Sequence, residues 1–167
     1  MNTGVQRSGS TPLGASTATT PGGKIRPKKN MPKILEAHGI PYVATANGSY
    51  PLDLYEKFQK ARDIKGAKYI HILSACPPGW GYDPKDTIKV GKLANETGFW
   101  PLYEIINGKL SISKDSKKYL DPSKRKPIEE YLKTQKRFNS IGQKELEEYR
   151  RYIDDLWKEI KMRIESQ

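Results

Sequence analysis

The chain has 167 residues, with 30 lysines and arginines against 19 acidic residues, a formal net charge of +11, one cysteine and two histidines. The length fits one domain. A single thiol excludes an intrachain disulfide and disfavours a Cys/His zinc site built by this chain alone. No stretch approaches the roughly 20 apolar residues of a membrane-spanning helix, and no secretory signal opens the sequence. We therefore expect a protein of the reducing cytoplasm without membrane contact.

Residues 1–30 differ in composition from the rest of the chain. They carry five basic residues and no acidic one, and they are mostly Thr, Ser, Gly, Ala and Pro. Such a stretch cannot fold alone, which leaves a disordered basic tail, an organelle transit peptide or an ordered loop held by something outside it. Repeated Gly and Pro break every candidate amphipathic turn, so the transit peptide is the least favoured of the three.

Helices and strands alternate in the next part of the sequence. The longer of its two helices carries an apolar stripe at helical spacing, formed by Leu52, Tyr55, Phe58 and Ala61. The apolar run YIHILSA is typical of a buried strand. The predicted elements are a short helix at Lys33–His38, a strand at Pro41–Ala46, a helix at Pro51–Ile64 and a buried strand at Tyr69–Ala75.

The second half of the chain predicts a hairpin and more helices. Asn107-Gly108 is the strongest short hairpin signal. The last helix has apolar residues at steps of three and four, which we expect to pack on the domain itself. The predicted elements are a helix at Asp86–Glu96, hairpin strands at Trp100–Ile106 and Lys109–Ser113, a Lys-rich connector at 114–126, a helix at Pro127–Arg137 and a final helix at Gln143–Ile164.

These elements predict an α/β fold with helices on the faces of a sheet. Only two or three strands and a hairpin are present, which is few for an independent sheet. The fold therefore looks incomplete, as when a chain begins partway through a domain.

The single cysteine, Cys76, follows the predicted strand YIHILSA, in the sequence SACPPGWG. Functional groups in α/β folds gather at the ends of strands, and a cysteine followed by proline is typical of iron–sulfur ligation. A free cysteine is equally a small buried hydrophobic residue, and three of the four thiolates of a cluster are absent from this chain. We expect His71 to be a satisfied core or interface histidine, and we assign no catalytic role to it or to His38.

Five segments, in this order, resemble the carboxy-terminal half of the beta subunit of pyruvate:ferredoxin oxidoreductase and related 2-oxoacid:ferredoxin oxidoreductases. The resemblance runs over nearly the whole chain, and its first and third segments are specific. The segments are MNTGVQRSGSTPLGASTATTP, AHGIPYVATA, YIHILSACPPGWG, ETGFWPLYEI and KPIEEYLKTQKRF.

The resemblance implies an oxidoreductase subunit that works with thiamine diphosphate, Mg²⁺, 4Fe–4S clusters and coenzyme A. In this family a 2-oxoacid is oxidatively decarboxylated and the electrons pass through the clusters to ferredoxin. The implied partners are the remaining half of the beta subunit, the alpha, gamma and delta subunits or domains, and ferredoxin. Pyruvate is the expected substrate, with a branched-chain 2-oxoacid as the alternative.

Three site residues are implied by the resemblance. Asn2 matches the asparagine that ends the thiamine motif, which gives it a catalytic and cofactor-binding role, and its neighbour Thr3 is implied to bind the cofactor less directly. Cys76 matches the fourth cysteine ligand of the cluster nearest the thiamine. The family's Gly-Asp-Gly and Cys-x-x-Cys motifs are missing here, so the chain resembles a truncated or split subunit, inactive alone.

The implied fold is an incomplete carboxy-terminal part of a thiamine-diphosphate-binding α/β domain. Residues 1–30 are a cofactor-site loop and basic linker, 31–113 belong to the α/β domain, and 114–167 are a basic connector with carboxy-terminal helices. One alternative comes from another class, a basic module that binds RNA or an acidic protein. The aromatic residues near the basic side chains look like packing residues and not like an exposed surface on which bases stack. Nucleic acid is therefore not the expected partner.

Overall fold

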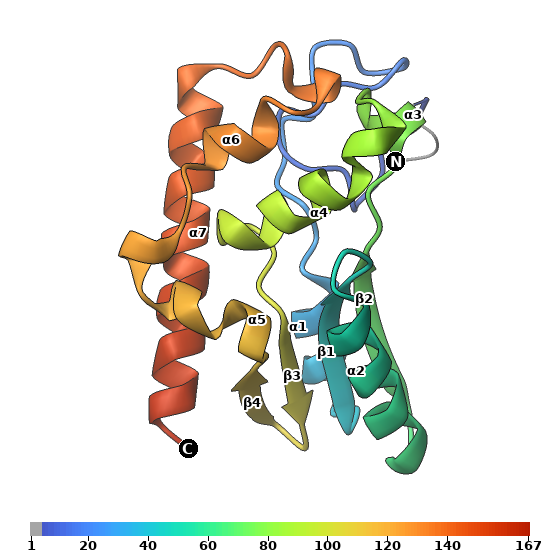
Figure 1. Cartoon of the computed structure of the whole chain (residues 1–167), viewed down its shortest axis with the longest axis vertical. Coiled ribbons are helices and arrows are strands. Elements are labelled where there is room, and N and C mark those ends of the chain that lie inside the picture. The colour runs from blue at the N-terminus through green and yellow to red at the C-terminus, as the bar shows by residue number, and fades with distance from the viewer. Residues whose placement is uncertain (1–4) are drawn as a thin grey trace.

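The computed structural model describes residues 5–167 and contains a four-stranded mixed sheet (Figure 1). The strand order is β2-β1-β3-β4, with β1 and β2 parallel and the other pairs antiparallel. Asn107 and Gly108 both adopt positive φ between β3 and β4, which confirms the predicted hairpin. The strands are β1 (Tyr42–Asn47), β2 (Lys68–Leu73), β3 (Tyr103–Ile106) and β4 (Lys109–Ile112).

Helices cover both faces of this sheet, as an α/β fold requires. α1 (Met31–Ala37) and α7 (Gln143–Glu165) pack on one face, where Val43 and Ile105 meet Ile160. α2 (Pro51–Asp63) packs on the opposite face against Tyr42 and Ala44. Successive residues of β1 therefore enter two different cores, and the whole strand is buried. The coarse prediction of an α/β fold with a carboxy-terminal helix is confirmed.

A second core lies beyond one end of the sheet, where α4 and α6 pack against the upper part of α7 (Figure 1). Phe99 stacks on Tyr131 with ring centroids 5.3 Å apart, and the Trp157 indole donates to the Gly98 carbonyl at 2.8 Å. The remaining elements are α3 (Pro77–Trp80), η1 (Pro84–Asp86), α4 (Thr87–Glu96), α5 (Lys114–Lys117), η2 (Lys118–Leu120), η3 (Pro122–Lys124), α6 (Ile128–Leu132) and η4 (Lys136–Phe138).

The predicted helix Pro127–Arg137 is wrong in its second half. α6 ends at Leu132, and the chain continues into the 3-10 turn η4. The Thr134 hydroxyl and the Gln135 amide both donate to the Tyr131 carbonyl, at 2.7 and 2.9 Å. Side chains thus satisfy a carbonyl that a longer helix would pair with a backbone amide, which lets the helix stop.

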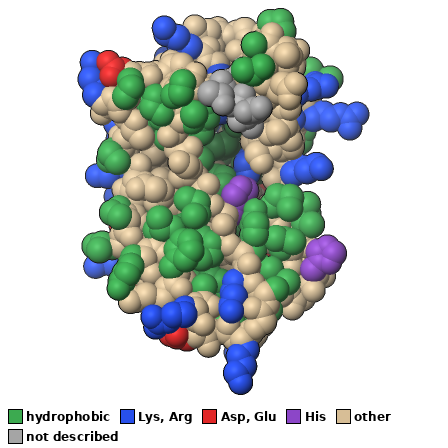
Figure 2. Space-filling view, turned by 90° about the vertical axis from the view of Figure 1, so that its right-hand side faces the viewer, with side chains coloured by type: hydrophobic (Ala, Val, Ile, Leu, Met, Phe, Trp, Pro, Cys, Tyr) green, Lys and Arg blue, Asp and Glu red, His purple; other side chains and the backbone are tan. Residues whose placement is uncertain are grey.

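Two apolar segments are more exposed than the sequence predicted. β2 is an edge strand of the described sheet and its residues are exposed or half-buried, so the prediction of a buried strand is wrong. α2 forms as predicted, but Leu52, Tyr55 and Phe58 are 77%, 61% and 51% exposed. Its buried face carries Asp53, Lys57 and Ala61 instead. Figure 2 shows hydrophobic side chains gathered over α2 at the lower left.

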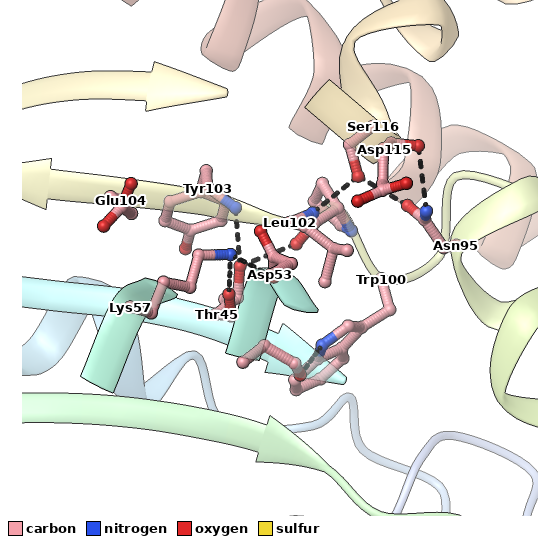
Figure 3. A network of polar contacts seen from close by, with 12 residues as sticks. Thr45, Asp53, Lys57, Asn95, Trp100, Leu102, Tyr103, Glu104, Asp115 and Ser116 are labelled. Atoms are coloured by element: carbon pink, nitrogen blue, oxygen red, sulfur yellow. Dashed lines mark hydrogen bonds and ion pairs between the residues drawn. The ribbon is translucent and has the colours of Figure 1, made fainter. Parts of the chain in front are cut away.

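The polar face of α2 is held to the sheet by a buried ion pair (Figure 3). The Lys57 ammonium, 1% exposed, donates to Asp53 Oδ2 and to the Thr45 carbonyl, both at 2.7 Å. The Thr45 hydroxyl donates to the Pro101 carbonyl at 2.7 Å and accepts from the Tyr103 amide at 3.0 Å. One chain of contacts therefore joins α2, β1 and the start of β3.

Residues 5–30 contain no long helix or strand, yet part of this loop is buried. Thr11 and Ala15 are 0% exposed. The Tyr149 hydroxyl donates to the Leu13 carbonyl at 2.7 Å, and the Ser16 amide donates to the Arg137 carbonyl at 2.8 Å. These contacts with α7 and η4 agree with the alternative of an ordered loop and not with a disordered tail. Within residues 5–167, no helix is both long and apolar enough to cross a membrane.

We predict that Asp53→Ala lowers the free energy of unfolding by about 3 kcal/mol, because it leaves the Lys57 cation buried without its carboxylate. Urea unfolding followed by circular dichroism measures the change. Asp63→Ala, at the end of the same helix, removes an exposed carboxylate that pairs with Arg62 at 2.9 Å and is expected to have no measurable effect. Equal losses in the two variants would contradict the assignment of Lys57–Asp53 as the anchor of α2.

Candidate functional site around Cys76

The cysteine lies just beyond the carboxyl ends of two parallel strands. β1 and β2 run in the same direction, so their carboxyl ends meet at one edge of the sheet, where the Gly48 amide donates to the Leu73 carbonyl at 3.1 Å. Cys76 follows three residues later, in extended backbone at the start of α3. Pro77 occupies the first helical position, where a missing amide costs nothing. The strand therefore delivers the thiol to the type of edge where α/β folds place their sites.

The turn after Cys76 is short and tightly supported. The Trp80 amide donates to the Cys76 carbonyl at 2.9 Å, and Gly81 adopts a left-handed φ of +74°. A Cβ at Gly81 would lie 2.7 Å from Lys136 Cβ, and the Lys136 amide donates to the Gly81 carbonyl at 3.2 Å. The turn is thus bound directly to η4, which fixes the position of the cysteine.

A buried cation supports this turn from below. The Arg137 guanidinium is centred 3.9 Å from the Trp80 ring centroid, and the residue is 6% exposed. Its Nε donates to Gln135 Oε1 at 2.9 Å. Burial lowers the pKa of Arg137, and neighbouring tyrosine hydroxyls only partly oppose this shift. Among the described residues no carboxylate forms an ion pair with it, so uncompensated positive charge lies beneath the cysteine turn.

The donor chemistry fits one ligand of a shared iron–sulfur cluster. The Cys76 thiol is free and partly exposed, so ligands from another polypeptide can meet it. Within residues 5–167 no group of three or more Cys, His, Asp or Glu side chains is placed to hold a metal ion. A cluster held by four thiolates is anionic overall, which suits the positive charge of Arg137 below. The described part of the chain thus offers a single ligand and not a complete site.

The other two predicted site residues, Asn2 and Thr3, lie outside the described residues. The loop that follows them is anchored by Lys24, whose ammonium donates to the carbonyls of Ser8, Gly9 and Thr11 at 3.1, 3.4 and 2.7 Å. Burial lowers the pKa of Lys24, with a smaller effect from nearby cations. The Lys24 ammonium thus hydrogen-bonds to backbone carbonyls that no regular helix or strand pairs in this glycine-rich stretch.

A cavity of about 290 Å³ lies between the loop, β2 and α7. Figure 2 shows the molecule hollowed near the middle of the face that carries β2. Lys28 Nζ lies 3.4 Å from His71 Nε2 and 4.8 Å from the centroid of the Trp100 ring. His71 is half-buried on an edge strand and its Nδ1 has no hydrogen-bond partner among the described residues. This contradicts the core part of the expected core or interface histidine, and the interface part stays a prediction.

Sequence reasoning missed this cavity and the role of Arg137. From the sequence alone, Lys28 is one of five basic residues among the first 30, and Arg137 is the last residue of a predicted helix. No short-range sequence pattern shows that β2, the loop of residues 5–30 and η4 lie close together in the fold.

Comparison with known proteins gives close relatives over nearly the whole chain. Pyruvate synthase subunit PorB of Methanothermobacter marburgensis is 50% identical over 97% of this chain and 56% of its own length. PorB of Methanocaldococcus jannaschii is 52% identical over 93% of the chain and 52% of its own length. Ketoisovalerate oxidoreductase subunit VorB of Pyrococcus abyssi is 42% identical over 96% of the chain and 52% of its own length. No family model matches the chain.

Identity at this level over nearly the whole chain means common descent with beta subunits of 2-oxoacid oxidoreductases. The chain belongs to the family of the PorB and VorB subunits, as its resemblance implied. It spans about half the length of the curated relatives it matches.

We predict that Gly81→Ala destabilises the fold more than Gly108→Ala does. Both glycines have positive φ, at +74° and +81°, so both variants carry a similar backbone cost of about 1–2 kcal/mol. Only the Gly81 variant adds a contact with Lys136, because nothing lies within 4 Å of the Cβ position at Gly108. Urea unfolding compares the two variants.

The same pair of variants tests whether η4 positions the cysteine. Gly81→Ala is expected to change the rate at which Cys76 reacts with a thiol reagent, because the turn must move away from Lys136. Gly108→Ala is expected to react like the unmodified chain. Identical rates in all three proteins would argue against this coupling.

Proposed function

We propose that this chain is the carboxy-terminal part of the thiamine-binding beta subunit of a pyruvate:ferredoxin oxidoreductase, in which Cys76 is one ligand of a 4Fe–4S cluster. The observation that carries the proposal is the partly exposed cysteine at the end of β2, fixed on a turn above the buried Arg137. The identity to PorB subunits supports it independently. Alone, the chain is expected to be inactive.

The chemistry of the reaction comes from groups bound between this chain and other polypeptides. When bound, thiamine diphosphate with Mg²⁺ would supply the chemistry of carbon–carbon cleavage, a 4Fe–4S cluster would supply electron transfer toward ferredoxin, and coenzyme A would serve as the acyl acceptor. In this chain, the Cys76 thiolate would hold one iron of the cluster, and the Arg137 cation would favour a negatively charged cluster. Asn2 and Thr3 are proposed to contact thiamine and substrate by hydrogen bonding.

Pyruvate is the substrate that the comparisons favour. The PorB relatives of the two methanogens are 50% and 52% identical to the chain, whereas VorB of Pyrococcus abyssi is 42% and PorB of Pyrococcus furiosus 41% identical. A branched-chain 2-oxoacid is therefore the alternative within the same reaction. The alternative of an RNA- or protein-binding module is not favoured, because half of all residues match an oxidoreductase subunit.

The remaining part of the beta subunit is the partner we propose for the exposed face of α2. Leu52, Tyr55 and Phe58 form an apolar stripe that no described residue covers. The adjoining edge of β2 carries Ile72, which is 39% exposed. Exposed apolar side chains that lie together on a protein surface often mark a site of interaction with another protein. The relatives are about twice as long as this chain, so they contain polypeptide that can cover the face.

We predict that Cys76→Ala removes one cluster from the complex assembled with the missing polypeptides. The variant loses one of the thiolates that a cluster needs, so iron and acid-labile sulfide per complex fall by one cluster and its electron paramagnetic signal disappears. Pyruvate-dependent reduction of viologen dye falls with it. Ser74→Ala, an exposed position two residues earlier, is the matched control. Undiminished iron content in the assembled Cys76 variant would refute the ligand assignment.

We also predict that Phe58→Asp weakens binding of the polypeptide that corresponds to the rest of a PorB subunit. A buried carboxylate without a partner opposes association, and we expect at least a tenfold increase in Kd, about 1.4 kcal/mol, by calorimetric titration. Met162→Asp places the same charge at another exposed apolar position, on α7, and is expected to bind normally. If both variants bind like the unmodified chain, α2 is not the contact face.

A further inference from the structure

The Lys28 cation lines the cavity and has no acidic partner among residues 5–167. The ammonium contacts the His71 imidazole and the face of the Trp100 ring, and neither of these groups carries negative charge. Burial lowers the pKa of Lys28 to about 8, with a smaller contribution from Lys24, and no nearby carboxylate opposes the shift. Burial and the proximity of Lys28 lower the pKa of His71 to about 4, so the imidazole is neutral.

The walls of this cavity are largely aromatic. Trp100 and Phe99 line it from the segment that precedes β3, and Tyr149 and Tyr152 line it from α7. The volume of about 290 Å³ lies at the lower end of ligand pockets, which begin at roughly 300 Å³. A small molecule or a single side chain with an apolar body fits such a space.

The charged groups around the cavity are of mixed sign. Lys29 lies beside Lys28 in the loop, and α7 contributes Glu148, Arg151 and Asp155. Neither acidic residue forms an ion pair with Lys28. Tyr103 also lines the cavity, and burial raises its pKa, so it carries no charge near neutral pH. Of these cations, Lys28 is the one whose ammonium lies over an aromatic wall of the cavity, 4.8 Å from the centroid of the Trp100 ring.

We propose that this cavity binds an organic carboxylate with a compact apolar body, whose carboxylate pairs with the Lys28 ammonium while its body packs on Trp100 and the tyrosines of α7. The carboxylate belongs either to a free small molecule or to an Asp or Glu side chain of a polypeptide that packs over β2. Both sources present the same chemistry to Lys28. The site is separate from Cys76 and does not depend on the proposed reaction.

An anion in the cavity changes the titration of Lys28 in a defined direction. Without it, the folded chain binds fewer protons than the unfolded chain between about pH 8 and 10.5, so stability rises with pH in this window. A bound carboxylate favours the charged ammonium and raises the pKa of Lys28 toward its ordinary value. The proton count of the folded chain then approaches that of the unfolded chain, and the pH dependence becomes flatter.

The test uses the complete chain with its lysines carrying ¹³C-methyl groups, and phenylacetate as the probe. Nuclear magnetic resonance follows the Lys28 signal, assigned by its absence in Lys28→Met, while Lys92→Met removes an exposed lysine as the matched control. We expect the midpoint of Lys28 to rise by at least one pH unit at saturating phenylacetate. The neutral analogue phenylacetamide is expected to leave it unchanged.

A second measurement separates the two sources of the carboxylate. In the complex with the missing polypeptides, a zero-length carbodiimide reagent joins Lys28 to an Asp or Glu of another polypeptide when a side chain occupies the site. A shift with phenylacetate and no cross-link indicates a free carboxylate ligand. The proposal is overturned when phenylacetate leaves Lys28 unmoved and no cross-link forms, or when phenylacetamide raises the midpoint as much as phenylacetate does.

Discussion

The structure depends on how the backbone groups at the end of β1 are hydrogen-bonded beyond the residues that pair with β3. β1 pairs with β3 only over Tyr42–Ala44, whereas its pairing with β2 continues to Asn47. Beyond Ala44, the Thr45 hydroxyl bonds the chain before β3, and the Trp100 indole donates to the Ala46 carbonyl at 2.9 Å. Side chains thus replace a strand, because buried backbone groups must be paired. The sheet opens at this point, and Trp100 becomes both a structural partner of β1 and a wall of the cavity.

Two cations lie beyond this opening, the buried Arg137 and the half-buried Lys28, and neither has a carboxylate partner among residues 5–167. Lys57, by contrast, is stabilised in the usual way for a buried cation, because it pairs with the Asp53 carboxylate and donates to the Thr45 carbonyl. Arg137 and Lys28 have aromatic rings and neutral acceptors instead. An unpaired buried charge is costly, so these two positions are where a negatively charged group stabilises the chain most. The cluster proposed at Cys76 and the carboxylate proposed near Lys28 would each provide one.

Local signals in the sequence predicted the elements but not their surroundings. α7 followed from apolar steps of three and four, and the hairpin from Asn107-Gly108, because a helix face and a two-residue turn are encoded within a few neighbouring residues. The early end of α6 was missed because it depends on the Thr134 and Gln135 side chains, which compete with backbone pairing. The candidate ligand Cys76 came from family resemblance, whereas Lys28 and Arg137 needed the assembled fold.

The largest disagreement between sequence and structure is itself informative. The apolar pattern of Tyr69–Ala75 and the stripe Leu52, Tyr55 and Phe58 predict buried surfaces, yet β2 lies at the edge of the described sheet and the stripe faces outward. An apolar stripe in the sequence indicates that a helix face is buried in the assembled protein. It does not indicate which polypeptide buries it. An exposed edge strand also leaves backbone groups available for pairing. The relatives are about twice as long as this chain, and both uncovered surfaces adjoin the edge of the sheet that carries Cys76, the proposed cluster ligand. One additional polypeptide placed along β2 and α2 accounts for all of these features together.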